Sequence, residues 1–427
     1  MIRRTTAARG LALAAVLSLG LAACSSSTEE GTGGASSSAA ADPLKVGTLL
    51  PVTGTLAFLG PPEIAGVGLA VDEINEAGGV LGSEVELTQA DSGDSTDMTV
   101  SSQSATDLIG QGVSVVIGAA SSSVSQNVQP TLNEAGVMQI SPANTATDLS
   151  GVNPLFSRTA PPDTVQGSAL GSLVLDDGHT NVAILAQNES YGTGLRDNVQ
   201  KAIEAGGGSV VYGATGAGQE FQPGESNFSA IVTAALAQKP DAIVVVAFEE
   251  TVAIVNELVA QGWDFNGTTY FCDGNTASYA DQFDPGTLEG VVGTIPGAQA
   301  EGEFREAVSG WWEENEGEPL SDFSYAAESY DAVMLAALAA VRGGATDGQT
   351  ISDNIQAVSG SEGGTECTTF AECVDALESG DEIQYTGKSG IGPLNADNDP
   401  SSAFIGVYAY AADNTVSWTR AIEGSVG

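Results

Sequence analysis

Basic residues are scarce in this sequence. Of its 427 residues, 12 are Lys or Arg and 55 are Asp or Glu, so the formal net charge at pH 7 is −43. So negative a field repels nucleic acids and anionic membrane surfaces, and we expect neither as a partner. We attribute the acidity to a surface adapted for solubility or salt tolerance rather than to a specific cation site.

Residues that carry catalytic chemistry are equally few. The only histidine is His179, in a polar stretch typical of a solvated turn, and no GxSxG, HExxH or P-loop pattern occurs. The sequence therefore predicts a protein that is not an enzyme and that holds no cofactor and no metal.

The N-terminus carries an apolar run, LALAAVLSLGLAA at residues 11–23, which follows three arginines and is too short to span a membrane comfortably. The run ends in LAAC, with the cysteine at Cys24, and this resembles a bacterial lipobox. The resemblance implies that residues 1–23 are a signal peptide and that Cys24 carries the lipid; ordinary secretion with an incidental cysteine is the alternative. Residues 24–42 then form a low-complexity, flexible tether.

Three cysteines remain once Cys24 is assigned to the lipid. Cys367 and Cys373 lie six positions apart in a loop that enters a helix, and export to an oxidising compartment favours a local disulfide between them. A metal site is the alternative, but no histidine lies nearby. Cys272 lies in an apolar stretch and is predicted to be a buried thiol.

Strand and helix patterns alternate from Leu44 onward. Apolar runs predict strands at 44–52, 84–89, 113–117, 137–140, 182–186, 209–212, 242–247, 268–272 and 290–294, with short later strands at 404–411 and 416–418. Helical spacing predicts helices at 62–77, 97–109, 164–175, 192–205, 225–238, 251–261, 301–315, 321–342, 353–358 and 370–378. This alternation predicts an α/β fold with two doubly wound parallel sheets.

The last third of the chain contains too few predicted strands for a sheet of its own. We therefore expect its helices to pack on the first lobe, so that the chain crosses between the lobes more than once. Several parallel strands would then form the hinge, with a cleft between the lobes.

Two loops rich in small hydroxyl residues follow neighbouring predicted strands, in VIGAASSS and QISPANTATDL. Ligands of open parallel sheets bind at the carboxyl ends of the strands, where the next helix begins with unpaired N–H groups. Ser122 at such a helix start is a candidate seat for a carboxylate, with a plain helix cap as the alternative. Turn chemistry explains Thr145 equally well, with Asn144 as the local hydrogen bonder.

The segments LKVGTLLPVTG, AVDEINEAGG, VVIGAASSSVSQ, FSRTAPPD and VAILAQNESYGTGL follow one another from Leu44 onward. Together they resemble the leucine/isoleucine/valine-type periplasmic solute-binding proteins of ABC importers, over essentially the whole mature chain. The resemblance implies a type I periplasmic binding protein fold, whose two lobes, joined by a three-segment hinge, close over a ligand. The implied N-terminal lobe is 44–162 and 297–395, and the C-terminal lobe is 163–296 and 396–427.

The resemblance also implies which residues hold the ligand. In relatives that bind amino acids, a first-lobe serine and a small-residue loop hold the ligand head, a second-lobe acid pairs with its ammonium, and aromatic and apolar side chains wall the site. The corresponding ligand-binding residues here are Leu59, Ser122, Ala143, Thr145, Tyr191, Phe248 and Asp273. Relatives commonly carry Glu in place of Asp273 and Tyr in place of Phe248, so the exact ligand stays open.

The residues themselves allow two interpretations. Asp273 ends a buried strand and needs a partner, which a ligand ammonium or a backbone cap would both supply. Tyr191 and Phe248 fit a core as well as a cleft, although Tyr191 lies in a strand-to-helix loop, which favours the cleft.

The function that the resemblance implies is capture without chemistry. We expect a monomeric lipoprotein, anchored by lipid on the outer face of the cell membrane, that binds a branched-chain or other small aliphatic amino acid. It would deliver this ligand to the permease subunits of an ABC importer. The alternatives are the same fold binding urea, short amides or another carboxylate, and a ligand sensor coupled to a membrane signalling partner.

Overall fold

The computed structural model describes residues 42–300 and 302–425. The predicted signal peptide, Cys24 and nearly all of the tether lie outside the described residues. Within them, no helix has the length and apolar character needed to cross a membrane.

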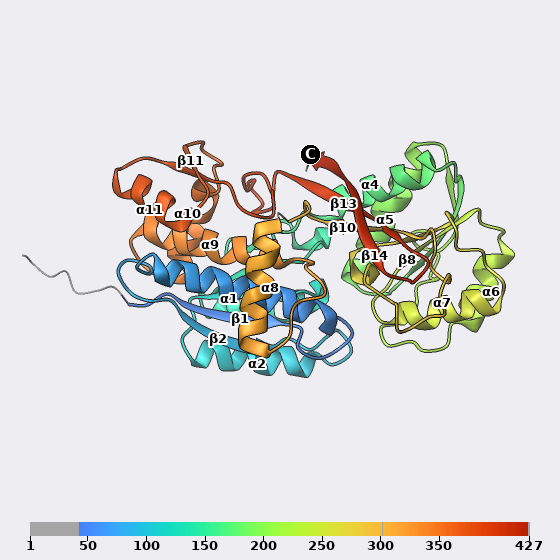
Figure 1. The fold of residues 1–427 in the computed structure, drawn as a ribbon, viewed down its shortest axis with the longest axis horizontal. Coiled ribbons are helices and arrows are strands. Elements are labelled where there is room, and N and C mark those ends of the chain that lie inside the picture. The colour runs from blue at the N-terminus through green and yellow to red at the C-terminus, as the bar shows by residue number, and fades with distance from the viewer. Residues whose placement is uncertain (1–41, 301, 426–427) are drawn as a thin grey trace, which may run out of the picture. The chain divides into compact units, whose positions relative to one another are not determined.

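The first lobe, on the left in Figure 1, is built on a five-stranded sheet. Its strands are all parallel and lie in the order β2-β1-β3-β4-β5. Its strands are β1 (Lys45–Leu50), β2 (Glu86–Asp91), β3 (Val115–Gly118), β4 (Met138–Ser141) and β5 (Phe156–Arg158). The helices between them are α1 (Gly60–Glu76), α2 (Met98–Gly110) and α3 (Ser122–Glu134). All residues of β3 and β4 are buried, as expected for central strands of a parallel sheet covered on both faces.

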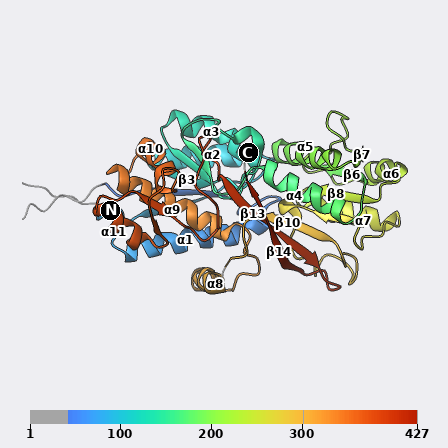
Figure 2. The same cartoon turned by 90° about the horizontal axis from the view of Figure 1, so that it is seen from above.

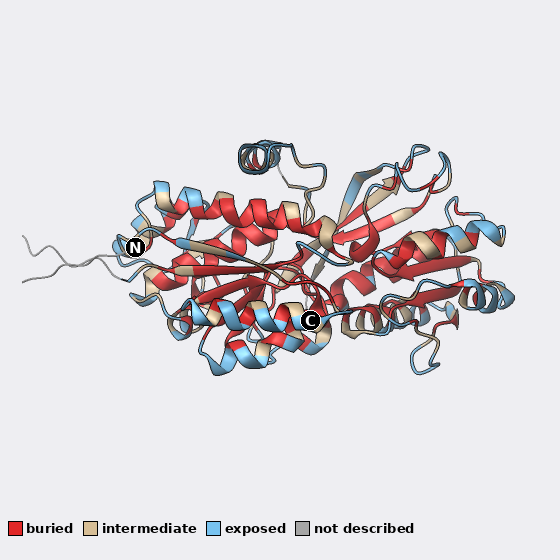
Figure 3. Ribbon diagram, turned by 90° about the horizontal axis from the view of Figure 1, so that it is seen from below, coloured by how far each residue is buried: buried red, intermediate tan, exposed pale blue. Residues whose placement is uncertain are grey.

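The second lobe is built on a seven-stranded sheet in the order β14-β13-β10-β9-β8-β6-β7. Its strands are β6 (Asn181–Ala186), β7 (Ser209–Tyr212), β8 (Ala242–Val246), β9 (Thr269–Phe271), β10 (Val292–Pro296), β13 (Ser402–Tyr410) and β14 (Val416–Ser425). Its helices are α4 (Asp163–Asp176), α5 (Ser190–Ala205), α6 (Ser229–Ala237) and α7 (Glu250–Ala260). Figure 3 shows that burial is concentrated in the strands and on the inward faces of the helices. The prediction of two doubly wound α/β lobes is confirmed.

The remaining helices belong to the first lobe, as predicted. They are α8 (Gly302–Glu316), α9 (Ala326–Gly343), α10 (Gly348–Val358) and α11 (Phe370–Glu378). Helix α9 is buried along nearly its whole length and packs beside α1 in both views (Figures 1 and 2). Helix α9 can approach α1 closely because Gly66 of α1 has no side chain. A Cβ at Gly66 would lie 2.2 Å from the carbonyl oxygen of Ala326.

Helix α10 and strand β14 are longer than the predicted 353–358 and 416–418. Three other differences from the sequence predictions affect the fold. Strand β13 pairs antiparallel with β10, so the expected hinge of parallel strands is wrong at the last crossing. Helix α9 begins at Ala326 rather than at residue 321, because Tyr325 adopts a left-handed backbone conformation with φ 60° that a helix cannot include. A small parallel sheet of β11 (Thr365–Cys367) and β12 (Ile383–Tyr385) was not predicted.

The structure joins Cys367 and Cys373 by the predicted disulfide, at a Cα–Cα distance of 5.3 Å. Cys272 is a buried free thiol, as predicted. His179 lies in the turn after α4, where its Nε2 is 2.7 Å from the carbonyl oxygen of Gly267. Among the described residues, no group of three or more His, Cys, Asp or Glu side chains is arranged to hold a metal ion.

Candidate functional site

A small cavity of about 20 Å³ lies where residues of the two lobes meet. Its lining combines helix starts and loops of both lobes: Leu56, Leu59, Ala120, Ser121, Ser122, Ala143, Tyr191, Phe248, Asp273, Gly274 and Tyr325. Every ligand-binding residue expected from the sequence lines this cavity except Thr145, which is buried two positions beyond Ala143. This volume admits about one water molecule, so a larger ligand requires the lobes or the lining side chains to move.

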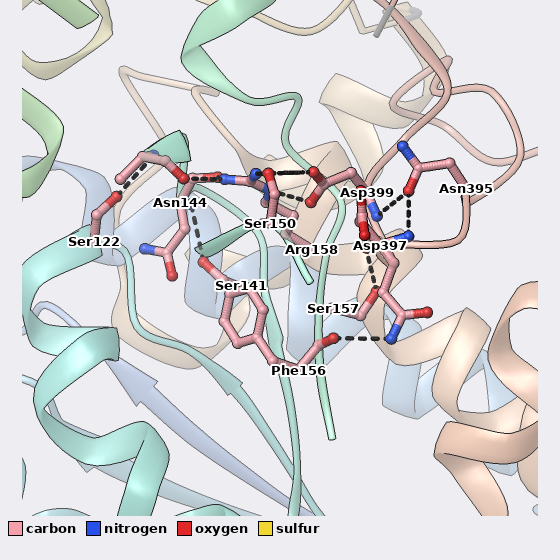
Figure 4. Close-up of polar contacts among 12 residues, drawn as sticks. Ser122, Ser141, Asn144, Ser150, Phe156, Ser157, Arg158, Asn395, Asp397 and Asp399 are labelled. Carbon is pink, nitrogen blue, oxygen red and sulfur yellow. Dashed lines mark hydrogen bonds and ion pairs between the residues drawn. The ribbon is translucent and has the colours of Figure 1, made fainter. Parts of the chain in front are cut away.

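The start of α3 holds both first-lobe loops in place. The helix cap is Ser121, whose side chain accepts a hydrogen bond from Val124 N at 3.4 Å. Ser122 is instead the first helical residue, and its Oγ accepts a hydrogen bond from the backbone N–H of Ala146 at 3.3 Å (Figure 4). The Ser122 hydroxyl therefore connects the two loops and lies at an N-terminus that favours anions.

Asn144 ties the second loop to the first. Its side-chain amide donates to the carbonyl oxygens of Ala119 at 3.0 Å and Ala120 at 2.8 Å. The expectation that Asn144 makes local hydrogen bonds in the turn is wrong: its side chain bonds residues 24 and 25 positions away, because the first loop lies against it. The hydroxyl of the neighbouring Thr145 is buried and makes no hydrogen bond that satisfies ordinary geometry within the described part of the chain.

A buried ion pair supports this loop from behind. The Arg158 guanidinium is inaccessible to solvent, and its Nε lies 2.6 Å from Oδ1 of Asp399. The same guanidinium donates to the carbonyl oxygens of Asn144 at 3.2 Å and Ala146 at 2.8 Å, and to Ser150 Oγ at 2.7 Å (Figure 4). Because two of these bonds end on backbone carbonyl oxygens of the loop that follows β4, Arg158 fixes the position of that loop.

Asp273 receives two tyrosine hydroxyls. Tyr191 donates to its Oδ1 and Tyr325 to its Oδ2, both at 2.8 Å. Tyr191 also stacks on Phe248, with ring centroids 5.4 Å apart and planes 9° from parallel. Burial raises the pKa of Asp273 although the tyrosine hydrogen bonds lower it. The carboxylate is thus held in a fixed orientation inside an apolar enclosure.

Asp163, which the sequence did not single out, places a second carboxylate close to Asp273. It is the first residue of α4, has no exposed surface, and neither oxygen has a hydrogen-bond partner of ordinary geometry among the described residues. Burial, and then the negative charge of Asp273, raise the pKa of Asp163 well above its usual value. Asp163 does not line the cavity, but its charge interacts with that of Asp273, so the two buried carboxyl groups together would stabilise a positive charge bound beside Asp273.

The lobes touch directly beside the cavity. Ser123 at the start of α3 donates to Glu189 Oε2, and Gln126 Nε2 donates to Ser190 Oγ at 2.9 Å. Glu189 also caps α5 by accepting from Gly192 N at 2.7 Å. These contacts hold the cleft closed in this structure.

A model of the periplasmic binding protein family matches residues 43–374 of this sequence. The chain belongs to the periplasmic binding protein family. The matched region begins two residues before β1 and ends within α11. It includes every residue that lines the cleft.

Curated relatives of this periplasmic binding protein share about half of its length. A Leu/Ile/Val-binding protein of Rhizobium johnstonii is 33% identical over 203 residues, which are 47% of this chain and 53% of the relative. A leucine-, isoleucine-, valine-, threonine- and alanine-binding protein of Pseudomonas aeruginosa is 30% identical over 203 residues, 47% of this chain and 52% of the relative. The chain thus spans about half the length of the curated relatives it matches.

Solved structures resemble this binding protein over nearly the whole chain. A leucine-binding protein from Thermotoga maritima has a TM-score of 0.72 at 22% identity and covers 89% of this chain and 98% of its own. A branched-chain amino acid transporter substrate-binding protein from Streptococcus pneumoniae, in complex with isoleucine, has a TM-score of 0.71 at 22% identity, with coverages of 90% and 100%. A solute-binding protein from R. palustris in complex with benzoate reaches 0.68 at 18% identity, with coverages of 90% and 98%. At these identities the likeness shows the fold.

One further carboxyl group of the binding protein lies on α9, three positions beyond Tyr325, which lines the cleft. Glu328 on α9 is 4% exposed, and burial raises its pKa from 4.5 to about 8, with a further contribution from Asp331. The other titratable groups whose charges interact with it are Glu63 on α1, Tyr325 and Tyr408. Between these two pKa values the native state binds a proton that the unfolded chain has released, so stability falls as pH rises through this window.

We therefore expect Glu328→Gln to remove much of this pH dependence. Near pH 4, Glu328 is largely protonated in both the native and the unfolded wild type, so the variant should match the wild type there. Above about pH 8 the variant should be more stable than the wild type. Urea unfolding of both proteins at several pH values across the window measures the difference. An unchanged slope in the variant would show that Glu328 titrates normally.

Proposed function

We propose that this chain is an extracytoplasmic solute-binding protein that captures an amino acid, branched-chain or otherwise small and aliphatic, between its lobes and delivers it to an ABC importer. The observation that carries the proposal is a cleft lining that brings the buried Asp273 carboxylate together with Ser122 at the start of α3, with the buried Asp163 carboxyl group close to Asp273. A zwitterion with adjacent ammonium and carboxylate groups complements both sides.

Under this proposal each part of the cleft has a role. The ligand carboxylate would lie at the α3 N-terminus, and its ammonium would lie between Thr145, Asp163 and Asp273. Leu59, Ala143 and the stacked ring of Phe248 are apolar, so they would surround an aliphatic side chain. The curated relatives are named for leucine, isoleucine and valine, which agrees with this lining.

Neutral or purely anionic ligands fit this electrostatic arrangement less well. Urea and short amides would leave two buried carboxylates without a cation, and an aromatic carboxylate would add a third negative charge. We therefore favour an α-amino acid over these alternatives.

The mechanism needs no chemical step. The first-lobe loops bind the ligand head in an open form, and Tyr191, Phe248 and Asp273 add contacts as the lobes close, which shifts the open–closed equilibrium. The lobes proposed to move are 44–162 with 297–395 and 163–296 with 396–427. Lipid on Cys24 would hold the protein near the permease.

Calorimetric titration with three matched ligands tests the proposal. Leucine should bind, whereas 4-methylpentanoate, which lacks the ammonium, and leucinamide, which lacks the carboxylate, should each bind at least roughly 100-fold more weakly. Valine, alanine, urea and benzoate complete the series. Binding of urea or benzoate in the absence of any amino-acid binding would overturn the ligand assignment.

Tyr325, which the sequence prediction placed inside a helix, should contribute to this binding. Tyr325→Phe removes a hydroxyl that orients and stabilises the Asp273 carboxylate, so we expect affinity to fall about tenfold. Without this donor the pKa of Asp273 should rise. As the pH is lowered, Asp273 should therefore become protonated, and the protein should lose its ligand, at a higher pH than in the wild type. Titrations across a pH series distinguish this positioning role from a general loss of packing, which would weaken binding equally at every pH.

A further inference from the structure

A second and larger cavity, of about 340 Å³, lies beside the segment that joins β10 to α9. It is bounded by both acidic and aromatic side chains, namely Asp322, Phe323, Tyr325, Glu328, Tyr408 and Trp418. Tyr325 lines this cavity as well as the cleft, so the two spaces are adjacent but distinct. We refer to the larger space as the crossing cavity.

Glu328 is the most deeply buried acid of the crossing cavity. Its side chain is 4% exposed, and its carboxyl group forms no ion pair and no hydrogen bond to another side chain among the described residues. Oε1 lies against Gly297, where a Cβ would approach it to 2.4 Å, and both neighbours of Gly297 line the cavity. The carboxylate therefore reaches the cavity wall between Pro296 and Ala298. An ionised carboxylate is costly at such a buried position, so Glu328 keeps its proton up to about pH 8, and a positive partner bound there would stabilise the ionised form instead.

The surrounding groups indicate what kind of cation fits. Asp322 adds a second carboxyl, whose Oδ1 accepts from Ser324 N at 2.7 Å, and Tyr408 and Trp418 add aromatic surface. Arg305, the basic residue of the lining, lies with its guanidinium 4.4 Å from the centroid of the Phe323 ring and forms no ion pair with a described carboxylate. Aromatic faces with carboxylates attract organic cations.

A metal ion fits this cavity less well. No group of three or more His, Cys, Asp or Glu side chains within residues 42–300 and 302–425 is arranged to hold one. Divalent metal ions need several oxygen or nitrogen ligands at short range, whereas a substituted ammonium ion needs one carboxylate and apolar or aromatic contact.

We propose that the crossing cavity is a second binding site, which takes a small substituted ammonium ion paired with Glu328 and enclosed by Tyr408 and Trp418. The cavity is large enough for such an ion, and the acidic protein as a whole raises the local concentration of cations. The site lies outside the cleft and requires no ligand there.

A cation bound in this site would change the affinity of the cleft for its ligand, an inference that rests on the proposed function. Tyr325 contributes its ring to the crossing cavity and its hydroxyl to Asp273, so a cation that fixes Tyr325 also fixes the carboxylate that would hold the cleft ligand. Any such coupling is reciprocal: the cation and the amino acid must change each other's affinity by the same factor.

Tetramethylammonium is the probe for the test, with tert-butanol as its neutral counterpart of similar shape and sodium chloride as the control for ionic strength. Calorimetry of the purified protein should show saturable binding of tetramethylammonium and none of the two controls. Glu328→Gln should weaken this binding roughly tenfold or more, because it removes the charge and keeps the shape. The matched control is Glu366→Gln at an exposed position, which should leave the affinity unchanged.

Two further variants keep the test decisive. Val416→Trp introduces a large side chain at a half-buried position on the cavity wall, so it should block the probe without removing any charge. Asp273→Asn should retain probe binding even if it binds no amino acid, which separates failure of this site from failure of the proposed function. Saturable binding that survives both Glu328→Gln and Val416→Trp, or no binding beyond that of sodium chloride, would overturn the proposal.

Discussion

Replacing Asp273 by asparagine is expected to weaken amino-acid binding about 100-fold or more. The change leaves a ligand ammonium buried beside a neutral amide, and removing one partner of a buried ion pair costs about 3–5 kcal/mol. Asp163 still supplies one carboxylate, so binding should be weakened rather than abolished. Titration calorimetry with the preferred amino acid measures the effect.

The control for this variant is Asp281→Asn, an exposed acid of the same lobe, which should bind like the wild type. Folding should survive in Asp273→Asn, because the amide oxygen accepts from one tyrosine hydroxyl and the amide nitrogen donates to the hydroxyl oxygen of the other. Unchanged affinity in a folded Asp273→Asn protein would mean that this carboxylate serves only its two tyrosines.

Replacing Asp399 by alanine is expected to lower the free energy of unfolding by about 3–5 kcal/mol. The substitution leaves the Arg158 guanidinium, which has no exposed surface, without its carboxylate partner. Because Arg158 also holds the backbone of Asn144 and Ala146, cleft binding should weaken along with stability. Urea unfolding at neutral pH measures the first effect and calorimetry the second.

An exposed ion pair provides the matched control for that variant. Lys45 and Glu86 are 3.8 Å apart with side chains 39% and 60% exposed, so Glu86→Ala should change stability by less than about 1 kcal/mol. Equal effects of Asp399→Ala and Glu86→Ala would show that the Arg158 pair contributes no more than a surface pair.

The secondary structure could be predicted where a local pattern decides it. The helix at 370–378 and the strand at 209–212 match α11 and β7 residue for residue, because apolar periodicity and flanking turn residues mark their ends. The start of α9 could not be predicted in this way. Tyr325 is unremarkable within FSYAAES, and its left-handed conformation accompanies a hydrogen bond to Asp273, 52 residues away in the sequence.

The cleft residues also divide into those that the sequence could predict and those that it could not. Ser122, Ala143, Tyr191, Phe248 and Asp273 were expected from their positions after strands and from family resemblance, and they line one cavity. The signal for Asp163 was present in the sequence, an acid after two prolines at a helix start, but it is equally typical of a cap. Its burial arises where the second lobe, to which it belongs, meets the first lobe.

The sequence by itself determined the alternation of elements, the acidic surface and the residue types at the strand ends, because each of these is a local property of the chain. Only the tertiary structure decided which charges are buried together: Arg158 with Asp399, 241 positions apart, and Asp163 with Asp273. The physical reason is that the electrostatic need of a carboxylate depends on its exposure to water. That exposure is set by packing between segments that no local pattern relates.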